Sequence, residues 1–298
     1  MNELQHRQSL PLAEKILLSK ARIHEFYQRN NGNVFVSFSG GKDSTVLLHL
    51  VRSLYPDVPG VFVNTGLEYP EIKDFVKTQS NITWLRPHMT FKQVIERHGY
   101  PVISKQQAKF ISEVQNPTGH NQATINLRLT GINQRGIENP SMRIRKKWLY
   151  LIDSDIRISD KCCHVLKKQP IFEYQKKTKR VPFIGTMAAE SVMRQKSLLR
   201  TGCNIFSNRL RETKSQPLSF WLEEDIWAYI TANNLSYSRI YDMGETRTGC
   251  MFCMFGVHLE PAGNNRFQRM KKNHPKHYDF CMNKLGLGKV LNILGVNP

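Results

Sequence analysis

Residues 39–45 place two glycines, three hydroxyl side chains, a lysine and an aspartate in one short stretch. Adjacent glycines let the backbone approach a ligand closely and adopt positive φ angles. A helix that begins beside them presents free N–H groups and the positive end of its dipole, and Lys42 adds a full charge. An ordinary helix N-cap at Asp43 or Ser44 would explain one of these residues but not the whole set. The stretch therefore predicts a phosphate- or pyrophosphate-binding site made of Ser39, Gly40, Gly41, Lys42, Asp43, Ser44 and Thr45.

Four cysteines form a second candidate site. Cys162 and Cys163 are adjacent, and after 86 further residues Cys250 and Cys253 form a CxxC motif. A CxxC brings two thiolates onto one small turn, which is a common half-site for zinc or for an iron–sulfur cluster. The side chains of adjacent cysteines normally diverge, which suits the spread corners of a 4Fe–4S cluster better than one zinc ion. Cys203 is the first substitute if Cys162 or Cys163 points away.

Strands and helices alternate around these residues. Apolar periodicity predicts strands at 33–38, 58–63, 82–85 and 180–186, and helices at 11–30, 46–54, 91–97 and 217–230. This alternation predicts an α/β fold with a parallel, twisted sheet and helices on both faces. Ligands of such sheets bind at the carboxyl ends of the strands, where residues 39–45 and Asn64-Thr65-Gly66 both fall.

The chain has 298 residues and a formal net charge of +19, an excess that favours polyanionic partners. Six basic residues lie between Arg128 and Lys147, and seven lie in each of the segments 161–180 and 266–289. This clustering favours a nucleic-acid-binding face over a generally basic surface. No run of about 18 apolar residues occurs and no apolar signal segment follows the N-terminus, so no membrane partner is expected. The expected location is cytoplasmic, where the six cysteines stay reduced.

The chain is expected to divide near residue 240. Residues 113–150 lose periodicity and carry the turn signals Asn116-Pro117 and Asn139-Pro140. We interpret them as a basic, partly helical insertion that is either a substrate-binding segment or a solvated loop. The expected domains are 1–240, which includes this insertion, and 241–298, a C-terminal extension with the CxxC motif and basic helices.

Three segments and the cysteine arrangement carry a family resemblance. Residues 39–44 resemble the SGGxDS loop of the N-type ATP pyrophosphatases, the PP-loop superfamily, whose fold is adenine nucleotide alpha hydrolase-like. Residues 64–71 are similar to the DTGxxFPE stretch of the phosphoadenylyl-sulfate (PAPS) reductase family, with the uncharged Asn64 in place of its usual aspartate. Residues 217–230 are similar to that family's PLxxWxxxDxxxYI. The CC…CxxC arrangement resembles that of adenylyl-sulfate reductases with a 4Fe–4S cluster, which favours a cluster over zinc as the ligand of Cys162, Cys163, Cys250 and Cys253.

The resemblance implies ATP with Mg²⁺ as the bound nucleotide and catalytic roles for Lys42, Asp43 and Ser44. It also implies nucleotide contacts from Ser39, Gly40, Gly41, Lys42, Asp43, Ser44, Thr45, Asn64, Thr65, Gly66, Gly185 and Arg194.

Two departures separate the chain from sulfonucleotide reductases. Its pyrophosphate loop is the intact ATP version, and it ends in Gly295-Val296-Asn297-Pro298 rather than in a Glu-Cys-Gly-Leu-His tail. We therefore expect an ATP-dependent transferase that adenylates a substrate, releases pyrophosphate and delivers sulfur, similar to DNA phosphorothioation and tRNA thiolation ATP pyrophosphatases. The expected partners are ATP, a DNA or tRNA substrate and a sulfur-donor protein. The alternatives are a sulfonucleotide reductase with Cys203 or Cys281 as nucleophile, and a non-catalytic nucleotide-sensing module that binds nucleic acid.

Overall fold

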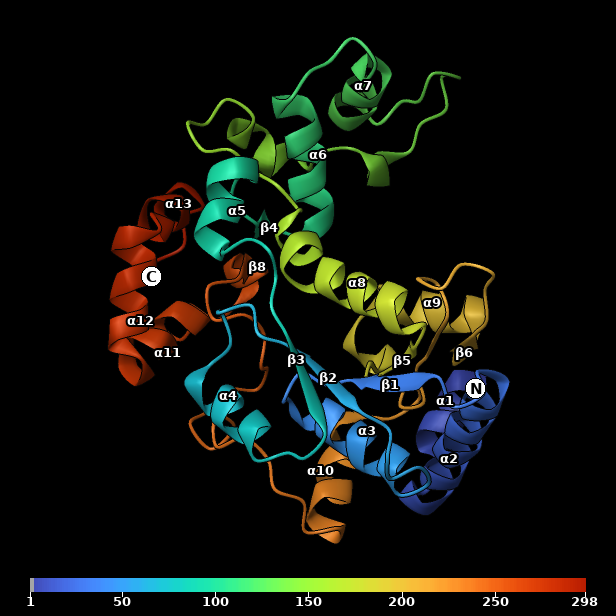
Figure 1. Ribbon diagram of the computed structural model, residues 1–298. Helices are drawn as coiled ribbons and strands as arrows, with labels where there is room; N and C mark the ends of the chain where they lie inside the picture. Colours follow the sequence, from blue (N-terminus) through green and yellow to red (C-terminus); the bar gives the residue numbers. More distant parts are fainter. Residues whose placement is uncertain (1–2) are drawn as a thin grey trace. The chain divides into compact units, whose positions relative to one another are not determined.

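The computed structural model describes residues 3–298, which divide into two compact units (Figure 1). The first unit contains the chain up to residue 64 together with residues 68–86 and 169–248. The second unit contains residues 65–67, 87–168 and 249–298. Each unit is thus assembled from several segments, and the expected domain boundary near residue 240 stays a prediction.

The first unit is built on a sheet that, within the described residues, has six strands in the order β3-β2-β1-β5-β7-β6. The strands are β1 (Val34–Ser37), β2 (Gly60–Val63), β3 (Ile82–Leu85), β5 (Val181–Ile184), β6 (Asn204–Ile205) and β7 (Lys214–Ser215). The helices are α1 (Glu3–Ser9), α2 (Leu12–Arg29), α3 (Lys42–Arg52), α4 (Pro70–Lys77), α8 (Gln169–Thr178), η4 (Ala188–Glu190), α9 (Val192–Thr201) and α10 (Glu223–Ala232).

Strand pairing confirms the predicted parallel sheet. β1 pairs in parallel with β2 on one side and with β5 on the other, and β7 continues the sheet in parallel beside β5. The two-residue strand β6 runs antiparallel to β7. Because the chain proceeds from β1 to β2 and β3 in one direction but places β5 on the other side, the carboxyl end of β1 lies at a topological switch point.

Helices cover both faces of this sheet, as the sequence predicts (Figure 1). Phe35 of β1 contacts Tyr174 of α8, with ring centroids 5.2 Å apart. Phe183 of β5 contacts Phe26 of α2 at 5.1 Å. Phe183 is in register with Val36, so it points to the face opposite to Phe35, because successive side chains of a strand alternate between faces. The aromatic rings of Phe26, Phe35 and Phe183 are fully buried, so apolar layers hold α2 and α8 on opposite sides of the sheet.

The helix predicted at 217–230 begins later than expected. Residues 216–221 form turns, in which the N–H of Trp221 bonds to the carbonyl oxygen of Leu218 at 3.0 Å. The buried indole of Trp221 donates to Ser19 Oγ at 2.9 Å, which holds this residue in the core beside α2. α10 then begins at Glu223, and the Asp225 carboxylate accepts the N–H of Leu222 at 2.7 Å, as a capping side chain does.

The second unit consists of helices around a two-stranded parallel sheet in which β4 (Val102–Ile103) pairs with β8 (Met254–Phe255). Its other elements are α5 (Phe91–His98), α6 (Lys105–Gln115), α7 (Gln122–Thr130), η1 (Pro140–Met142), η2 (Lys146–Leu151), η3 (His164–Lys168), η5 (Val257–Leu259), α11 (Arg266–Asn273), α12 (Pro275–Asp279), η6 (Phe280–Lys284) and α13 (Leu287–Ile293). α7, η1 and η2 confirm that residues 113–150 are partly helical. Within residues 3–298, no helix combines the length and the apolar character that crossing a membrane requires.

Candidate functional site

The loop of residues 38–41 joins β1 to α3 at the switch point, and α3 begins at Lys42. Gly40 has φ +75, and a Cβ built on it would lie 2.7 Å from Val76 Cγ2 of α4. Only glycine therefore fits at this turn. α3 thus begins at the carboxyl end of β1, and the binding of a phosphate by its first backbone N–H groups stays a prediction.

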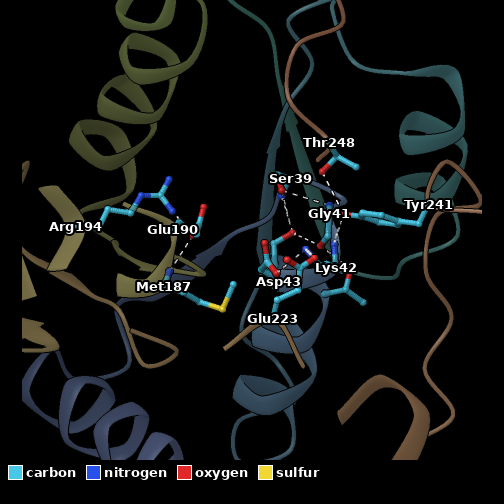
Figure 2. Close-up of polar contacts among 12 residues, drawn as sticks. Ser39, Gly41, Lys42, Asp43, Met187, Glu190, Arg194, Glu223, Tyr241 and Thr248 are labelled. Atoms are coloured by element: carbon cyan, nitrogen blue, oxygen red, sulfur yellow. Dashed lines mark hydrogen bonds and ion pairs between the residues drawn. The ribbon is translucent and has the colours of Figure 1, made fainter. Parts of the chain in front are cut away.

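Hydroxyl groups hold the loop in shape (Figure 2). The N–H of Ser39 donates to Ser44 Oγ at 3.1 Å, and Ser44 Oγ in turn donates to the carbonyl oxygen of Gly41 at 2.9 Å. Thr45 Oγ1 donates to the same carbonyl oxygen at 3.1 Å. Ser39, Ser44 and Thr45 thus lie together as predicted, and Ser44 and Thr45 direct their hydroxyls to the loop's own backbone.

Lys42 is the one cation among the predicted loop residues, and it is only 6% exposed. Its Nζ lies 3.2 Å from Glu223 Oε1 and 3.5 Å from Asp43 Oδ1. Burial by itself lowers the pKa of Lys42, but Asp43, Tyr241 and Glu223 together raise it above its ordinary value. The ammonium group therefore stays charged at the carboxyl edge of the sheet, where it can pair with an anion.

Glu223 is a residue of this site that the sequence did not reveal. The three acids at the start of α10 have a sufficient local explanation, since acidic side chains stabilise a helix N-terminus. The contact of Glu223 with Lys42 depends on α10 packing beside α3, which the local pattern does not encode.

Tyr241 and Thr248 also contact the loop, and neither was expected there (Figure 2). The N–H of Lys42 donates to the Tyr241 hydroxyl at 2.8 Å, and this hydroxyl lies 3.3 Å from Thr248 Oγ1. A Cβ built on Gly41 would lie 2.4 Å from Thr248 Oγ1, so the threonine hydroxyl rests directly on the glycine. The side chains of the segment 241–248 therefore cover the N–H group that a phosphate would use.

Asp43 has an unusual environment for a carboxylate. Burial raises its pKa, Lys42 lowers it, and the nearby Glu190 and Glu223 raise it further, so that the net shift is upward. Its Oδ1 is buried and makes no hydrogen bond within residues 3–298, apart from the 3.5 Å ion pair with Lys42. A carboxylate oxygen in this state fits a hard divalent cation such as Mg²⁺.

The structure brings Gly185 to the loop. A Cβ on Gly185, which follows β5, would lie 3.1 Å from the carbonyl oxygen of Asp43, so the two backbones run close together. Arg194 of α9 forms an ion pair with Glu190, and Glu190 Oε1 also accepts the N–H of Met187 at 3.0 Å (Figure 2). Arg194 is thus fixed by the same carboxylate that acts on the pKa of Asp43.

The predicted residues after β2 belong to both units. Asn64 ends the first segment of the first unit, whereas Thr65 and Gly66 belong to the second. Thr65 Oγ1 accepts the N–H of Leu67 at 3.2 Å, and Gly66 has φ +79. The roles of these three residues in nucleotide binding stay predictions.

The four predicted cysteine ligands all lie in the second unit, and none of them forms a disulfide with another described residue. Burial raises the pKa of Cys162, and the nearby thiols of Cys250, Cys163 and Cys253 raise it further. Burial also raises the pKa of Cys253, with Cys163 contributing in the same direction. Each of these two pKa values thus responds to other predicted ligand thiols, and the joint role of the four cysteines as ligands stays a prediction.

Two cations lie close to these thiols. Arg266 and Lys167 both act to lower the pKa of Cys253, and Lys167 acts likewise on Cys162. Arg266 Nη1 also donates to the carbonyl oxygen of Cys253 at 3.0 Å. In the part of the chain from residue 3 to residue 298, no three Cys, His, Asp or Glu side chains converge as a ligand group for a metal ion.

The remaining cysteines are engaged elsewhere. Cys203 lies in the first unit with its Sγ 3.1 Å from Ser219 Oγ, so it is not among the four thiols of the second unit. Cys281 is fully buried, its Sγ donates to the carbonyl oxygen of Tyr278 at 3.2 Å, and burial raises its pKa to about 12. Both thiols are held inside the protein, which does not suit a nucleophile.

Comparison with known proteins agrees with the sheet and the loop. The model of the phosphoadenosine phosphosulfate reductase domain matches residues 33–115 and 104–255. The chain is 26% identical over 271 residues to an uncharacterized protein of Methanocaldococcus jannaschii. The alignment covers 90% of this chain and 51% of that protein. It is 30% identical over 236 residues to an adenosine 5'-phosphosulfate reductase of Oceanobacillus iheyensis. This alignment covers 76% of this chain and 73% of the relative. The chain thus spans about half the length of the archaeal relative.

Among solved structures, the crystal structure of a phosphoadenylyl-sulfate reductase from Candida auris aligns with 84% of this chain and 96% of its own. The TM-score is 0.45 and the sequence identity is 14%.

Proposed function

The chain belongs to the phosphoadenosine phosphosulfate reductase domain family, with its adenine nucleotide alpha hydrolase-like fold, and from this premise we propose that it is an ATP-dependent adenylating enzyme. In the proposed reaction an oxygen of the acceptor attacks the α-phosphorus of ATP. A new P–O bond forms, the bond between the α-phosphorus and the bridging oxygen breaks, and pyrophosphate leaves with the electron pair.

The observation that carries this proposal is the charged, buried ammonium of Lys42 beside the glycine loop. Lys42, and the N–H groups at the start of α3 once the Tyr241 hydroxyl is displaced, would bind the β- and γ-phosphates and stabilise the negative charge of the departing pyrophosphate. Gly40 and Gly41 add no side chain of their own to the loop, and Thr248 Oγ1, which rests on Gly41, would have to move aside for a phosphate.

Asp43 would hold Mg²⁺ in this site, because its Oδ1 is a buried carboxylate oxygen without a hydrogen-bond partner in residues 3–298. Mg²⁺ supplies charge neutralisation for the phosphates when it is bound. Ser44 and Thr45 keep the loop carbonyl fixed, so the loop need not reorganise when the nucleotide binds.

We further propose that the acceptor is a nucleic acid and that the reaction serves sulfur transfer. The formal net charge of +19 favours a polyanionic acceptor. Cys162, Cys163, Cys250 and Cys253 would hold a 4Fe–4S cluster, with zinc as the alternative. Arg266 and Lys167 support the cluster, since nearby cations offset the negative charge of four thiolates.

A second candidate, sulfonucleotide reduction, has support from the 30% identical reductase of Oceanobacillus iheyensis. It requires a nucleophilic cysteine, and the burial of Cys203 and Cys281 argues against these two thiols in the conformation described. The test is a direct comparison of two assays. Incorporation of labelled pyrophosphate into ATP supports adenylation, whereas release of sulfite from adenylyl sulfate without that incorporation supports reduction.

A further inference from the structure

A groove of about 550 Å³ lies between α8 and the loop of residues 206–213 in the first unit. Its lining combines one aromatic ring, four cations and one carboxylate: Phe172, Lys176, Lys179, Arg209, Arg211 and Glu212. None of these residues belongs to the nucleotide loop or to the thiol group, so the residue roles proposed above do not account for the groove.

The groove has an excess of positive charge that the protein does not neutralise. Arg209 Nη1 pairs with Glu212 Oε1 at 3.3 Å, and Glu212 Oε2 accepts the hydroxyl of Ser207 at 3.0 Å. Lys176, Lys179 and Arg211 are exposed and form no ion pair with any of residues 3–298. Three cations therefore remain available to an anionic ligand.

The walls of the groove are fixed rather than flexible. The buried side chain of Gln175 on α8 donates through Nε2 to the carbonyl oxygen of Leu210 at 3.3 Å, which ties the loop to the helix. Within the loop, Thr213 Oγ1 donates to the carbonyl oxygen of Ser207 at 3.0 Å and accepts its N–H at 3.2 Å. The cations thus project from a pre-shaped surface, which lowers the entropy lost on binding.

One cation is also held in orientation. The Arg211 guanidinium carbon lies 5.2 Å from the centroid of the Phe172 ring, within the range of a cation–π contact. An arginine guanidinium can bind a phosphate through two parallel hydrogen bonds.

We infer that this groove binds the phosphodiester backbone of the nucleic-acid acceptor. The inference rests on the proposed function for the identity of the partner, and it assigns the contact surface to Lys176, Lys179 and Arg211. Nucleic acid is favoured over a single small anion because the three unpaired cations come from two separate segments that line the groove. Lys176 lies on α8 and Lys179 just after it, whereas Arg211 lies in the loop of residues 206–213. Binding through backbone phosphates is independent of base sequence and strongly salt-dependent.

The experiment is fluorescence anisotropy with a labelled tRNA and with a labelled DNA duplex, over a series of salt concentrations. The groove variant is Lys176→Glu/Arg211→Glu. The matched control is Lys77→Glu/Lys92→Glu, which changes the net charge equally at two exposed lysines that already pair with Asp74 and Glu96. Thermal melting of both variants establishes that they are folded.

The inference predicts that the groove variant binds at least about tenfold more weakly than the control at low salt, for at least one of the two nucleic acids. A plot of log K against log salt has a negative slope, and this slope should become shallower by about 2 for duplex DNA. The variant loses two phosphate contacts, and each contributes about 0.9. Equal affinities of the groove variant and the control would overturn it. Loss of binding to anionic phospholipid vesicles, with nucleic-acid binding intact, would also overturn it and assign the groove to a lipid surface.

Pyrophosphate incorporation separates this inference from the proposed function. If wild-type protein incorporates pyrophosphate into ATP but the groove variant binds nucleic acid like the control, the groove assignment alone fails. If the wild type does not incorporate pyrophosphate while the groove variant still loses nucleic-acid binding, adenylation fails and the groove assignment stands.

Discussion

The backbone N–H of Lys42 donates a hydrogen bond to the hydroxyl of Tyr241 at 2.8 Å, although the two residues are 199 positions apart. The ring of Tyr241 packs against Trp227 at 5.5 Å, so the hydroxyl is held at the loop by an aromatic contact with α10. The tyrosine occupies the N–H group that a nucleotide phosphate would use. We therefore expect the nucleotide to displace the tyrosine hydroxyl when it binds.

We expect Tyr241→Phe to bind ATP more tightly than the wild type. The substitution removes one competing hydrogen bond, and a net value of about 1 kcal/mol corresponds to about a fivefold lower dissociation constant. Isothermal titration calorimetry measures this change. The control is Tyr237→Phe, because the Tyr237 hydroxyl bonds to Asp242 at 3.1 Å rather than to the loop. Weaker binding by Tyr241→Phe would mean that the tyrosine contacts the nucleotide instead of competing with it.

When the pH is lowered, the binding of MgATP should begin to weaken at a higher pH than it would if Asp43 had an ordinary pKa. Burial raises the pKa of Asp43, and a protonated Asp43 cannot hold Mg²⁺. We expect the dissociation constant of the wild type, divided by that of Asp43→Asn, to rise as the pH falls through the raised pKa of Asp43. The ratio cancels the titration of the nucleotide itself. A ratio that does not change with pH would contradict the role assigned to Asp43.

The same pKa shift has a consequence of opposite sign for folding. Since the folded state raises the pKa of Asp43, this carboxyl favours folding below its ordinary pKa. That contribution is lost as the pH rises through the raised value. Asp43→Asn should therefore become relatively more stable than the wild type as the pH rises, which urea unfolding at several pH values measures.

The buried ion pair of Lys15 and Asp225 should be a large determinant of stability. Their Nζ and Oδ2 atoms are 2.7 Å apart, and the side chains are 3% and 10% exposed. Lys15→Met leaves a buried carboxylate without its partner, which costs about 3–5 kcal/mol of unfolding free energy. Urea unfolding checks this, and Lys77→Met, at an exposed pair, should leave the midpoint unchanged. A Lys15→Met midpoint equal to that of Lys77→Met would contradict the assignment.

Cys253→Ser should abolish the iron content and the brown colour of protein purified without oxygen. Cys253 is one of the four predicted ligands, all of which belong to the second unit, and thiolates are the ligands of iron–sulfur clusters. Cys203→Ser is the matched control and should keep both signals, because Cys203 lies in the first unit beside Ser219. One zinc and no iron in the wild type would contradict the cluster and leave a zinc site.

The sequence predicts the elements that local patterns encode and misses those that depend on distant contacts. β3 is predicted to the residue, and β1 and β5 nearly so, because each is a short run of mainly apolar and β-branched residues. The two-residue strands β6 and β7 carry no such pattern, since their pairing is set by the neighbouring β5. The helix predicted at 217–230 begins six residues late because Trp221 is held in the core by Ser19, 202 positions away.

The candidate site likewise has residues that the sequence predicts and residues that only the structure reveals. The residues of the loop are adjacent in sequence, so their types reveal the site directly. Glu223, Tyr241 and Thr248 reach the loop only through the packing of α10 and the segment after it. A glutamate in the first turn of a helix has an ordinary explanation in the helix dipole, and an isolated tyrosine or threonine carries no signal. These contacts therefore required the structure.

Incorporation of labelled pyrophosphate into ATP, with DNA or tRNA present as acceptor, tests the central claim most directly. The wild type should catalyse it, and Lys42→Ala should be slower by about 10²- to 10³-fold, because the variant lacks the charge that stabilises the departing pyrophosphate. The control is Lys77→Ala, at an exposed ion pair on α4, which should keep the wild-type rate. Equal rates for Lys42→Ala and the wild type, or release of sulfite from adenylyl sulfate with no pyrophosphate incorporation, would contradict ATP-dependent adenylation at this loop.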